Sequence, residues 1–283
     1  MTLTLSAFLP RRQRNVLPGF TPTLALTLVW LFVIVLGPLA VMLWFTASLG
    51  LHGFWSVITS ARVLGDLWVS LRAAFLAALI DAIFGLLVAW VLVRYQFPGR
   101  RLIDALVDLP FALPTAVAGI ALSALYAPSG WVGRLLAPLG LQIAFKPAGV
   151  VVAMMFIALP FIVRTVQPVI EDLEAEQEEA AHLMGASPWQ IFARISFPAI
   201  LPALLTGFAL AFARCLGEYG SIIFISSNKP MVSEIIPVLI VQQLDQFDYQ
   251  GATAIAALML GVSFALLLVI NLLQAWVRRR HGQ

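Results

Sequence analysis

The stretch Glu179-Ala180-Ala181-His182-Leu183-Met184-Gly185, followed ten residues later by Ile195-Ser196-Phe197-Pro198, is a polar island in a very apolar chain. Six of the fourteen acidic residues lie within nine positions around its start: Glu171, Asp172, Glu174, Glu176, Glu178 and Glu179. No lysine or arginine occurs between Arg164 and Arg194. A block of this kind between apolar segments is typical of a solvated loop, but its internal order indicates more.

The first half of this island has the pattern of a short amphipathic helix. Leu173, Ala180 and Met184 fall on one side of a helix of 3.6 residues per turn, and acids occupy the rest. Gly185 stands where a helix C-terminus favours a residue that tolerates positive φ. We therefore expect the helix to end in a glycine turn.

The second half predicts another short helix. Ser187-Pro188 has the pattern of an N-cap followed by a proline in the first turn. Trp189 and Phe192 provide an apolar side, and Pro198 is expected to end the helix. Trp189 either packs in this loop or serves as an interfacial anchor, a common role of tryptophan in membrane proteins. A helix, a glycine turn and a helix with a small Ala-Ala face suit insertion into a cleft on a soluble partner.

Composition places the rest of the chain in a membrane. The 283 residues are 61% hydrophobic and 11% charged, with a mean hydropathy of +0.96, whereas soluble domains carry about 25% charged residues. No room is left for a separate soluble domain. The single cysteine, Cys215, excludes a disulfide framework. The net charge of +3 does not imply nucleic acid as a partner, because the positive residues are distributed as topology signals.

Six apolar segments predict an all-α, multi-pass fold of about six transmembrane helices. They are Leu24–Leu49, Leu67–Val93, Leu106–Tyr126, Gly149–Val163, Ile200–Leu216 and Ala252–Val277. The fourth and fifth are short and are expected to extend through their flanks. We divide the chain into an N-terminal segment 1–23, a transmembrane domain 24–277 with a loop at about 171–198, and a basic tail 278–283.

Positive charges predict the orientation. With both termini inside, eleven lysines and arginines are cytoplasmic and six are external. This bias places both termini and the acidic loop in the cytoplasm of the cell. The external segment 217–251 contains two apolar stretches that are too short to span, 221–225 and 235–244, which are expected to be re-entrant or to pack on the rim of the bundle.

No catalytic constellation is found. The two lysines, Lys146 and Lys229, are not part of a G-x-x-x-x-G-K-[ST] phosphate loop, so another chain must bind ATP if ATP drives this protein. The three histidines are scattered and predict no metal site. No G-x-S-x-G element occurs. We expect no catalytic residue, metal or cofactor in this chain.

Charged residues inside the spans are candidates for a pathway. Arg214 and Glu218 are four residues apart, so they either pair on one helix face or face a ligand. Asp81 stands in the middle of the second span, as a hydrogen-bond partner to a neighbouring helix or as a pathway residue. Asp104 and Asp108 are expected at the start of the third span, where acids suit a helix N-terminus.

Prolines predict a break in the third span. Pro110 and Pro114 lie in the stretch Leu109–Gly119, and the small residues that follow permit close helix approach. A gating role and plain packing are both open for this break. Thr115 and Ser221 join Arg214 as candidate donors to an anion.

The acidic loop resembles the EAA loop of ABC importer permeases, whose pattern is E-A-A-x3-G-x9-I-x-L-P. Glu179, Ala180, Ala181, Gly185, Ile195 and Pro198 match at the family spacing, and Phe197 replaces the usual leucine. In that family the loop carries the coupling helix that docks into the ATPase subunit. The resemblance therefore implies coupling roles for these residues and for Trp189, with Glu179 as the main electrostatic anchor.

Other stretches are similar to the sulfate/thiosulfate branch of this family, from about residue 16 to the C-terminus. They are Arg94–Arg100, Asp108–Gly119, Pro160–Val169, Leu216–Ser221 and Gln246–Tyr249. The resemblance implies a type I ABC importer in a bacterial inner membrane. Its partners would be a second related permease or a second copy of this chain, two ATPase subunits that bind ATP and Mg, and an extracytoplasmic sulfate-binding protein.

Three alternatives stay open. Molybdate and tungstate permeases share much of the pattern. A proton- or sodium-driven secondary transporter would show inverted repeats and coupling carboxylates at mid-membrane, for which only Asp81 fits. A membrane scaffold or receptor without a pathway would use the helical pair only to bind another protein.

Overall fold

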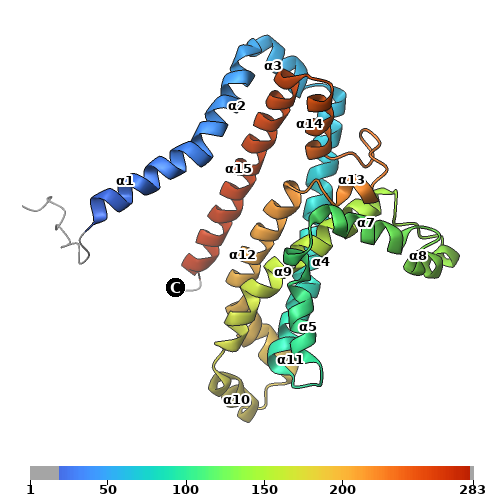
Figure 1. The fold of residues 1–283 in the computed structure, drawn as a ribbon. Coiled ribbons are helices and arrows are strands. Elements are labelled where there is room, and N and C mark those ends of the chain that lie inside the picture. The colour runs from blue at the N-terminus through green and yellow to red at the C-terminus, as the bar shows by residue number, and fades with distance from the viewer. Residues whose placement is uncertain (1–18, 281–283) are drawn as a thin grey trace, which may run out of the picture.

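The computed structural model describes residues 19–280, and every regular element in them is helical. Long helices lie side by side, with α10 at one end and α3 at the other (Figure 1). The elements are α1 Phe20–Leu31, η1 Phe32–Leu36, α2 Gly37–Ser48, α3 Gly50–Ile58, α4 Ala61–Arg94, α5 Arg100–Val107, α6 Leu109–Ala112, α7 Thr115–Tyr126, α8 Trp131–Leu136, η2 Ala137–Leu139, α9 Pro147–Glu171, α10 Ala175–Leu183, α11 Pro188–Ile191, η3 Phe192–Ser196, α12 Phe197–Leu216, α13 Ile222–Ile225, α14 Ile236–Asp245 and α15 Tyr249–Arg280.

Six helical segments of the described part are long and apolar enough to cross a membrane, which confirms the prediction of six spans. They are Pro22–Ser48, Ala61–Arg94, Thr115–Leu139, Pro147–Glu171, Pro188–Leu216 and Tyr249–Leu272. The fourth and fifth spans extend through their flanks, as expected. The two short apolar stretches predicted between the last spans form α13 and α14.

The core is the bundle of α4, α9 and α12. One face of α4 carries buried small residues, Ala73, Ala74, Ala77 and Ala78, which let the helix backbones approach closely. Ile162 of α9 is fully buried against this bundle. An added Cβ on Gly85 of α4 would overlap the Ile162 side chain, and one on Gly207 of α12 would lie 3.2 Å from its Cα atom. These glycines therefore set the spacing of the three helices.

Two π-helical turns each directly precede a proline near the start of the next helix. The turn 32–36 comes before Pro38, and the turn 192–196 comes before Pro198. Proline lacks the N–H that would continue the α-helical ladder, and a wider turn accommodates this loss. The expectation that Pro198 ends the second loop helix is therefore wrong, because the chain runs on helically from Pro188 into α12.

The third predicted span is broken, as its prolines predict. α6 ends at Ala112, Leu113 and Pro114 are not helical, and α7 starts at Thr115. α5 and α6 lead up to this break from the end of the molecule that carries α10, which we call the α10 end (Figure 1).

The prediction of a helix N-terminus is wrong for Asp104, whereas Asp108 does stand at the N-cap position of the short helix α6. Asp104 lies inside α5, and Asp108 is the residue at which α5 ends and α6 begins, without a side-chain capping bond. Both carboxylates instead bind Arg164 of α9, at 2.6 and 2.7 Å. The ion pairs fasten α5 to the core, a contact that sequence spacing alone did not indicate.

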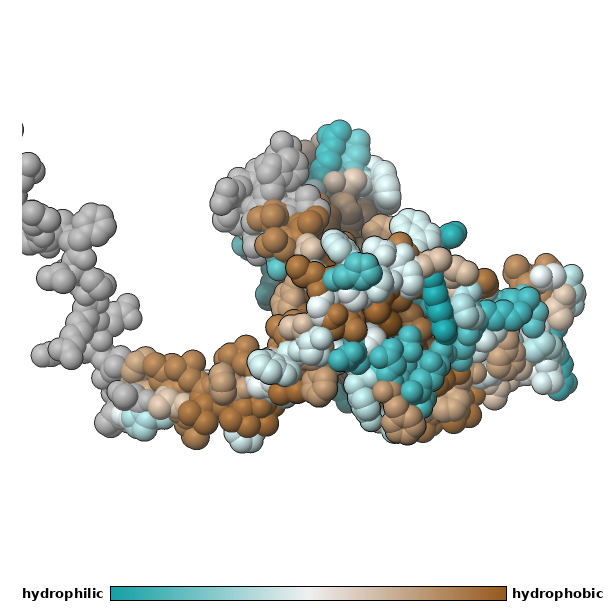
Figure 2. Space-filling model, turned by 90° about the horizontal axis from the view of Figure 1, so that it is seen from above, coloured by the Kyte–Doolittle hydropathy of each residue, from teal (hydrophilic) through white to brown (hydrophobic). Residues whose placement is uncertain are grey.

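The helix α1–η1–α2 extends from the bundle as an apolar arm. None of the residues in its apolar window is buried within this chain. Its surface is mostly brown, that is hydrophobic, in the view from above (Figure 2). The described helix starts at Phe20, not at residue 24, and α15 continues through residues 278–280 of the expected tail. Residues 1–18 of the N-terminal segment and residues 281–283 lie outside the described residues.

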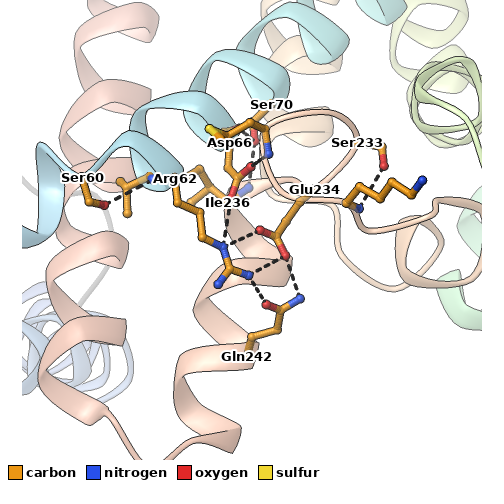
Figure 3. Close-up of polar contacts among 11 residues, drawn as sticks. Ser60, Arg62, Asp66, Ser70, Ser233, Glu234, Ile236 and Gln242 are labelled. Carbon is orange, nitrogen blue, oxygen red and sulfur yellow. Dashed lines mark hydrogen bonds and ion pairs between the residues drawn. The ribbon is translucent and has the colours of Figure 1, made fainter.

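The end opposite α10 is held by a polar network (Figure 3). Arg62, in the first turn of α4, donates to both carboxylate oxygens of Glu234, at 2.9 and 3.0 Å. Gln242 of α14 donates to Glu234 at 2.8 Å. The Oδ1 atom of Asp66 accepts from the backbone N–H of Met231 at 2.6 Å. The network fastens the segment before α14 to α4.

The carboxylate of Glu234 stays ionised in this setting. Burial acts to raise the pKa of Glu234, but the hydrogen bonds from Arg62 and Gln242 and the charge of Arg62 outweigh it, so the pKa is lowered below its ordinary value.

Candidate functional site

The turn after α10 has the geometry that the sequence predicts. Gly185 has φ +86°, its N–H donates to His182 O at 2.9 Å, and Ala186 N–H donates to Ala181 O at 3.0 Å. These are the two hydrogen bonds of a Schellman motif. The expected glycine turn is therefore confirmed as local structure.

The start of α11 is capped in the predicted way. The Ser187 side chain accepts from Gln190 N–H at 3.4 Å, and the Gln190 side chain accepts from Ser187 N–H at 2.8 Å. This reciprocal pair is a capping box, with Pro188 in the first turn. Gly185 and Ser187 together fix the angle between α10 and α11.

One face of this helical pair is exposed and apolar. Leu183 is 88% exposed, Met184 83% and Trp189 74%. Glu179 and Ala180 are exposed beside them, whereas Ala181 is buried against the chain. We call Glu179, Ala180, Leu183, Met184 and Trp189 the coupling face, after the ATPase-coupling role that the resemblance to the EAA loop predicts for this loop. Large apolar side chains gathered at such exposure are typical of a protein contact.

The opposite side of α10 is tied to the membrane helices by Glu178. Its carboxylate accepts from Arg94, the last residue of α4, at 2.6 and 3.0 Å, and from the Ser196 hydroxyl at 2.8 Å. The Arg94 guanidinium lies 5.0 Å from the Trp90 ring centroid, within the range of a cation–π contact. Sequence reasoning missed this role because Arg94 and Glu178 are 84 residues apart. The only hint in the sequence is that Glu178 and Glu179 are adjacent, whereas the family pattern includes only Glu179.

Aromatic rings pack the start of the fifth span against α4. Phe192 meets Trp90 edge to face at a ring distance of 5.2 Å, and Trp189 stacks on Phe192 at 5.6 Å. A cavity of about 560 Å³ opens beside these rings, between Trp90, His182 and Ile191 among others. Phe192 thus orders the start of the fifth span against α4. Met184 and most of Trp189 remain exposed.

The candidate pathway residues of α12 form an internal cluster. Arg214 pairs with Glu218 at 2.8 Å, one of the two arrangements that the four-residue spacing allowed, with Glu218 just beyond the end of α12. The other Glu218 oxygen accepts from the backbone N–H and the hydroxyl of Ser221, at 2.9 and 3.0 Å. Glu218 and Ser221 are buried, whereas the Arg214 side chain remains 31% exposed. The acid is fully compensated, and Arg214 is the partly exposed member of the cluster.

The break in the third span lies against this cluster. An added Cβ on Gly220 would overlap the hydroxyl of Thr115, and one on Gly119 would overlap the backbone of Ser221. The start of α7, with Pro114 and Thr115, is therefore packed on the segment that follows α12.

Pro110 does not join this cluster. It lies in α6, before the break, and its neighbour Phe111 meets Phe161 of α9 edge to face at 5.2 Å. The structure thus joins Arg214, Glu218 and Ser221 and packs Thr115 against the same segment, with Pro114 next to Thr115 in the chain.

Asp81 is 2% exposed in the middle of α4, and its Oδ2 atom has no hydrogen-bond partner within residues 19–280. A hydrogen bond from a neighbouring helix, one of the two roles considered for Asp81, is not found for this atom. The residue lies in the core and does not line any cavity described above.

The family model for the inner membrane component of binding-protein-dependent transport systems matches residues 81–283. The chain belongs to this family. It is therefore a transport component of an inner membrane.

The chain is similar to curated sulfate permeases. It is 53% identical over 253 residues to the sulfate transport system permease protein CysT of Synechocystis, covering 89% of this chain and 88% of the relative. It is 46% identical over 268 residues to CysT of Escherichia coli, covering 95% and 97%. The resemblance to the sulfate branch of the ABC importer permeases is confirmed.

Solved structures share the fold. A bacterial ABC transporter involved in alginate import matches with a TM-score of 0.76 at 19% identity, covering 90% of this chain and 94% of that one. The MetNI methionine ABC transporter matches with a TM-score of 0.57 at 20% identity, covering 77% and 95%. The predicted all-α fold of a type I ABC importer permease is confirmed.

Proposed function

We propose that this chain is the membrane-spanning permease subunit of an ATP-driven importer of sulfate or thiosulfate. It forms half of the pathway with a second, homologous permease. Two ATP-binding subunits bind ATP and Mg, and an extracytoplasmic sulfate-binding protein delivers the substrate. The names of relatives at 46–53% identity support the substrate, and the family description supports a binding protein. The α10 end and both termini face the cytoplasm in this proposal, as the positive charges indicate.

The single observation that carries the proposal is the exposed coupling face on a rigidly turned helical pair. Leu183, Met184 and Trp189 present apolar area that a soluble subunit can bury, and Glu179 adds a negative charge beside it. An ATPase cleft with a basic rim suits this surface. Helices of nine and four residues are marginal in water, so the Gly185 turn and the contacts of Phe192 must hold their shape.

Motion of the ATPase reaches the pathway through the contacts that Glu178 makes with Arg94 and Ser196. A displacement of α10 moves Glu178, which is bonded to Arg94 at the end of α4. It also moves Ser196, which leads without interruption into α12. α4 and α12 pack on α9 in the core, and α12 ends at the Arg214 cluster beside the break of the third span. A rigid-body shift of the loop is thus transmitted to both sides of this break.

The same cluster supplies donors for a tetrahedral oxyanion. Arg214 keeps an accessible guanidinium, and charge-assisted hydrogen bonds are the strong ones for such anions. The Thr115 hydroxyl lies at the start of α7, where backbone N–H groups are not used within the helix. Since Glu218 already neutralises Arg214 in part, the site binds weakly, as passage through a pathway requires.

The test is ATPase stimulation in the assembled complex. The chain is purified in mild detergent with its partner subunits and reconstituted, and binding protein loaded with sulfate, thiosulfate, molybdate or tungstate is added. The proposal predicts a co-purifying ATPase that sulfate-loaded or thiosulfate-loaded binding protein stimulates most. If only molybdate-loaded or tungstate-loaded binding protein stimulated the ATPase, the substrate would be molybdate or tungstate and not sulfate. Transport driven by a proton or sodium gradient without any ATPase would overturn the class.

A further inference from the structure

A polar cavity of about 550 Å³ lies where α4 gives way to α5. It is lined by Gln96, Phe97, Gly99, Arg100, Arg101 and Asp104, and we call it the α5 pocket. The chain turns sharply at Gly99, with φ +87°, so that two arginines follow at once at the start of α5. The pocket is separate from the coupling face and from the Arg214 cluster.

The two arginines of this pocket have no carboxylate partner among residues 19–280. Asp104 is one turn from Arg100 and would be its natural counter-ion. Arg164 of α9 holds Asp104 instead, at 2.6 Å, and also takes Asp108. Because Arg164 holds the carboxylate of Asp104, the one acid that lines the pocket, the guanidinium groups of Arg100 and Arg101 remain available to an external anion.

The surroundings of the pocket are those of a membrane boundary. α5 exposes large apolar side chains directly after the arginines: Leu102 is 65% exposed, Ile103 44% and Leu106 52%. Tyr95, at the end of α4, is 57% exposed, and tyrosine is enriched at the level of lipid headgroups. The α4 helix has 34 residues and is about 51 Å long, more than enough to cross a hydrocarbon layer of about 30 Å and reach this boundary.

We propose that the α5 pocket binds the phosphate headgroup of an anionic phospholipid in the leaflet on the α10 side. Arg100 and Arg101 donate to the phosphate oxygens, and the acyl chains lie along Leu102, Ile103 and Leu106. A phospholipid combines the anionic group and the apolar body that this arrangement requires. A carboxylate from a soluble subunit would satisfy the arginines and leave the apolar side chains uncovered.

A bound lipid would fix α5 from the outside, while Arg164 fixes it from the core. α5 and α6 lead directly to the break before α7. The lipid would therefore restrain the position of the chain just before this break. The inference goes beyond transport itself, because the headgroup is neither substrate nor energy source.

The experiment measures which lipids stay bound to the complex. The complex is reconstituted in nanodiscs of equal phosphatidylglycerol and phosphatidylcholine, extracted in mild detergent and analysed by native mass spectrometry. The test variants are Arg100→Gln, Arg101→Gln and the double substitution, and the double lysine variant preserves the charge. Arg194→Gln is the matched control, because Arg194 is an exposed arginine of the same end outside the pocket.

Phosphatidylglycerol is expected to be retained over phosphatidylcholine by the unsubstituted complex. Each glutamine substitution should lower this retention about fivefold, the change that corresponds to about 1 kcal/mol for one arginine at an anionic surface. The lysine variant should keep most of it, and Arg194→Gln should change nothing.

Three results would overturn the proposal. One is equal retention of phosphatidylglycerol by the unsubstituted complex and the double glutamine variant. Another is that millimolar inorganic phosphate displaces the bound lipid and the complex retains the two lipids equally. This result would assign the pocket to free phosphate. The third is loss of a protein subunit from the double variant with unchanged lipid, which would assign the arginines to a protein contact.

Discussion

Arg94 and Glu178 form a two-pronged ion pair that joins the end of α4 to α10, with nitrogen–oxygen distances of 2.6 and 3.0 Å. The pair is half-buried, and the Ser196 hydroxyl adds a third bond to the same carboxylate. It is the direct polar connection between the loop that carries the coupling face and the longest helix of the core.

Breaking this pair should uncouple the loop from the core. Arg94→Gln leaves the Glu178 carboxylate half-buried with only Ser196 as a partner, at a cost of about 1–3 kcal/mol. We expect the complex to assemble and hydrolyse ATP with at least tenfold less uptake per ATP. Reversing both residues, Arg94→Glu with Glu178→Arg, should recover part of the coupling. An unchanged ratio of uptake to hydrolysis in Arg94→Gln would contradict the transmission route.

Gly185 is required for its backbone conformation. A Cβ at this position would meet no atom within 4 Å, so space does not limit substitution and only φ +86° does. Gly185→Val should cost about 1–2 kcal/mol of strain and reduce assembly with the ATPase, whereas Gly185→Asn should be tolerated better. Co-purification yields of the two variants test this. Equal yields would remove the argument from the turn.

Trp189 should matter to the partner more than to this chain. Because the side chain is 74% exposed, Trp189→Ala should leave the thermal stability of the isolated subunit nearly unchanged. The assembled complex should still hydrolyse ATP but no longer move substrate, and Trp189→Phe should keep part of the transport. Cysteine crosslinks between the loop and the ATPase check assembly, and vesicle uptake checks transport. Full ATP-coupled uptake in Trp189→Ala would instead favour an interfacial anchor.

The network around Glu234 predicts a pH dependence of stability. The pKa of Glu234 is lowered from its ordinary value of 4.5, so its ionised form stabilises the folded state above that pH, and this contribution is lost as the pH falls through the lower folded pKa. Glu234→Gln should cost about 1–3 kcal/mol at neutral pH, because it removes a buried partner of Arg62.

Thermal unfolding in detergent, followed from neutral pH to below 4.5, measures this effect. The difference between the two proteins should narrow as the pH falls. Glu179→Gln, at an exposed position, is the control and should shift neither curve. A constant difference across this range would exclude the charge of Glu234 as the cause.

Local patterns in the sequence predicted much of the fold. Six apolar segments gave six spans, Pro114 marked the break before α7, and Gly185 and Ser187 marked the ends of the loop helices. These features depend on residues close together in the chain, so spacing and backbone preference are enough to find them. The pairing of Arg214 with Glu218 is of the same kind.

Long-range ion pairs could not be predicted in this way. Arg164 lies 60 residues from Asp104, and Arg62 lies 172 residues from Glu234. The local sequence around Asp104 favoured a role at a helix terminus, and nothing near Glu234 indicated a partner. The prediction that Pro198 ends a helix was wrong for another reason. A π-helical turn accommodates this proline inside a continuous helix, and the sequence alone does not distinguish this from a helix end.

ATP-driven uptake of sulfate into proteoliposomes tests the central claim most directly. The complex is reconstituted with ATP on the α10 side and sulfate-loaded binding protein on the other, and labelled sulfate inside the vesicles is counted. The account predicts uptake that requires ATP and the binding protein, and that falls to background in Arg94→Gln while hydrolysis continues. Sulfate uptake that proceeds equally without ATP, or no uptake in a complex whose ATPase responds to the loaded binding protein, would contradict it.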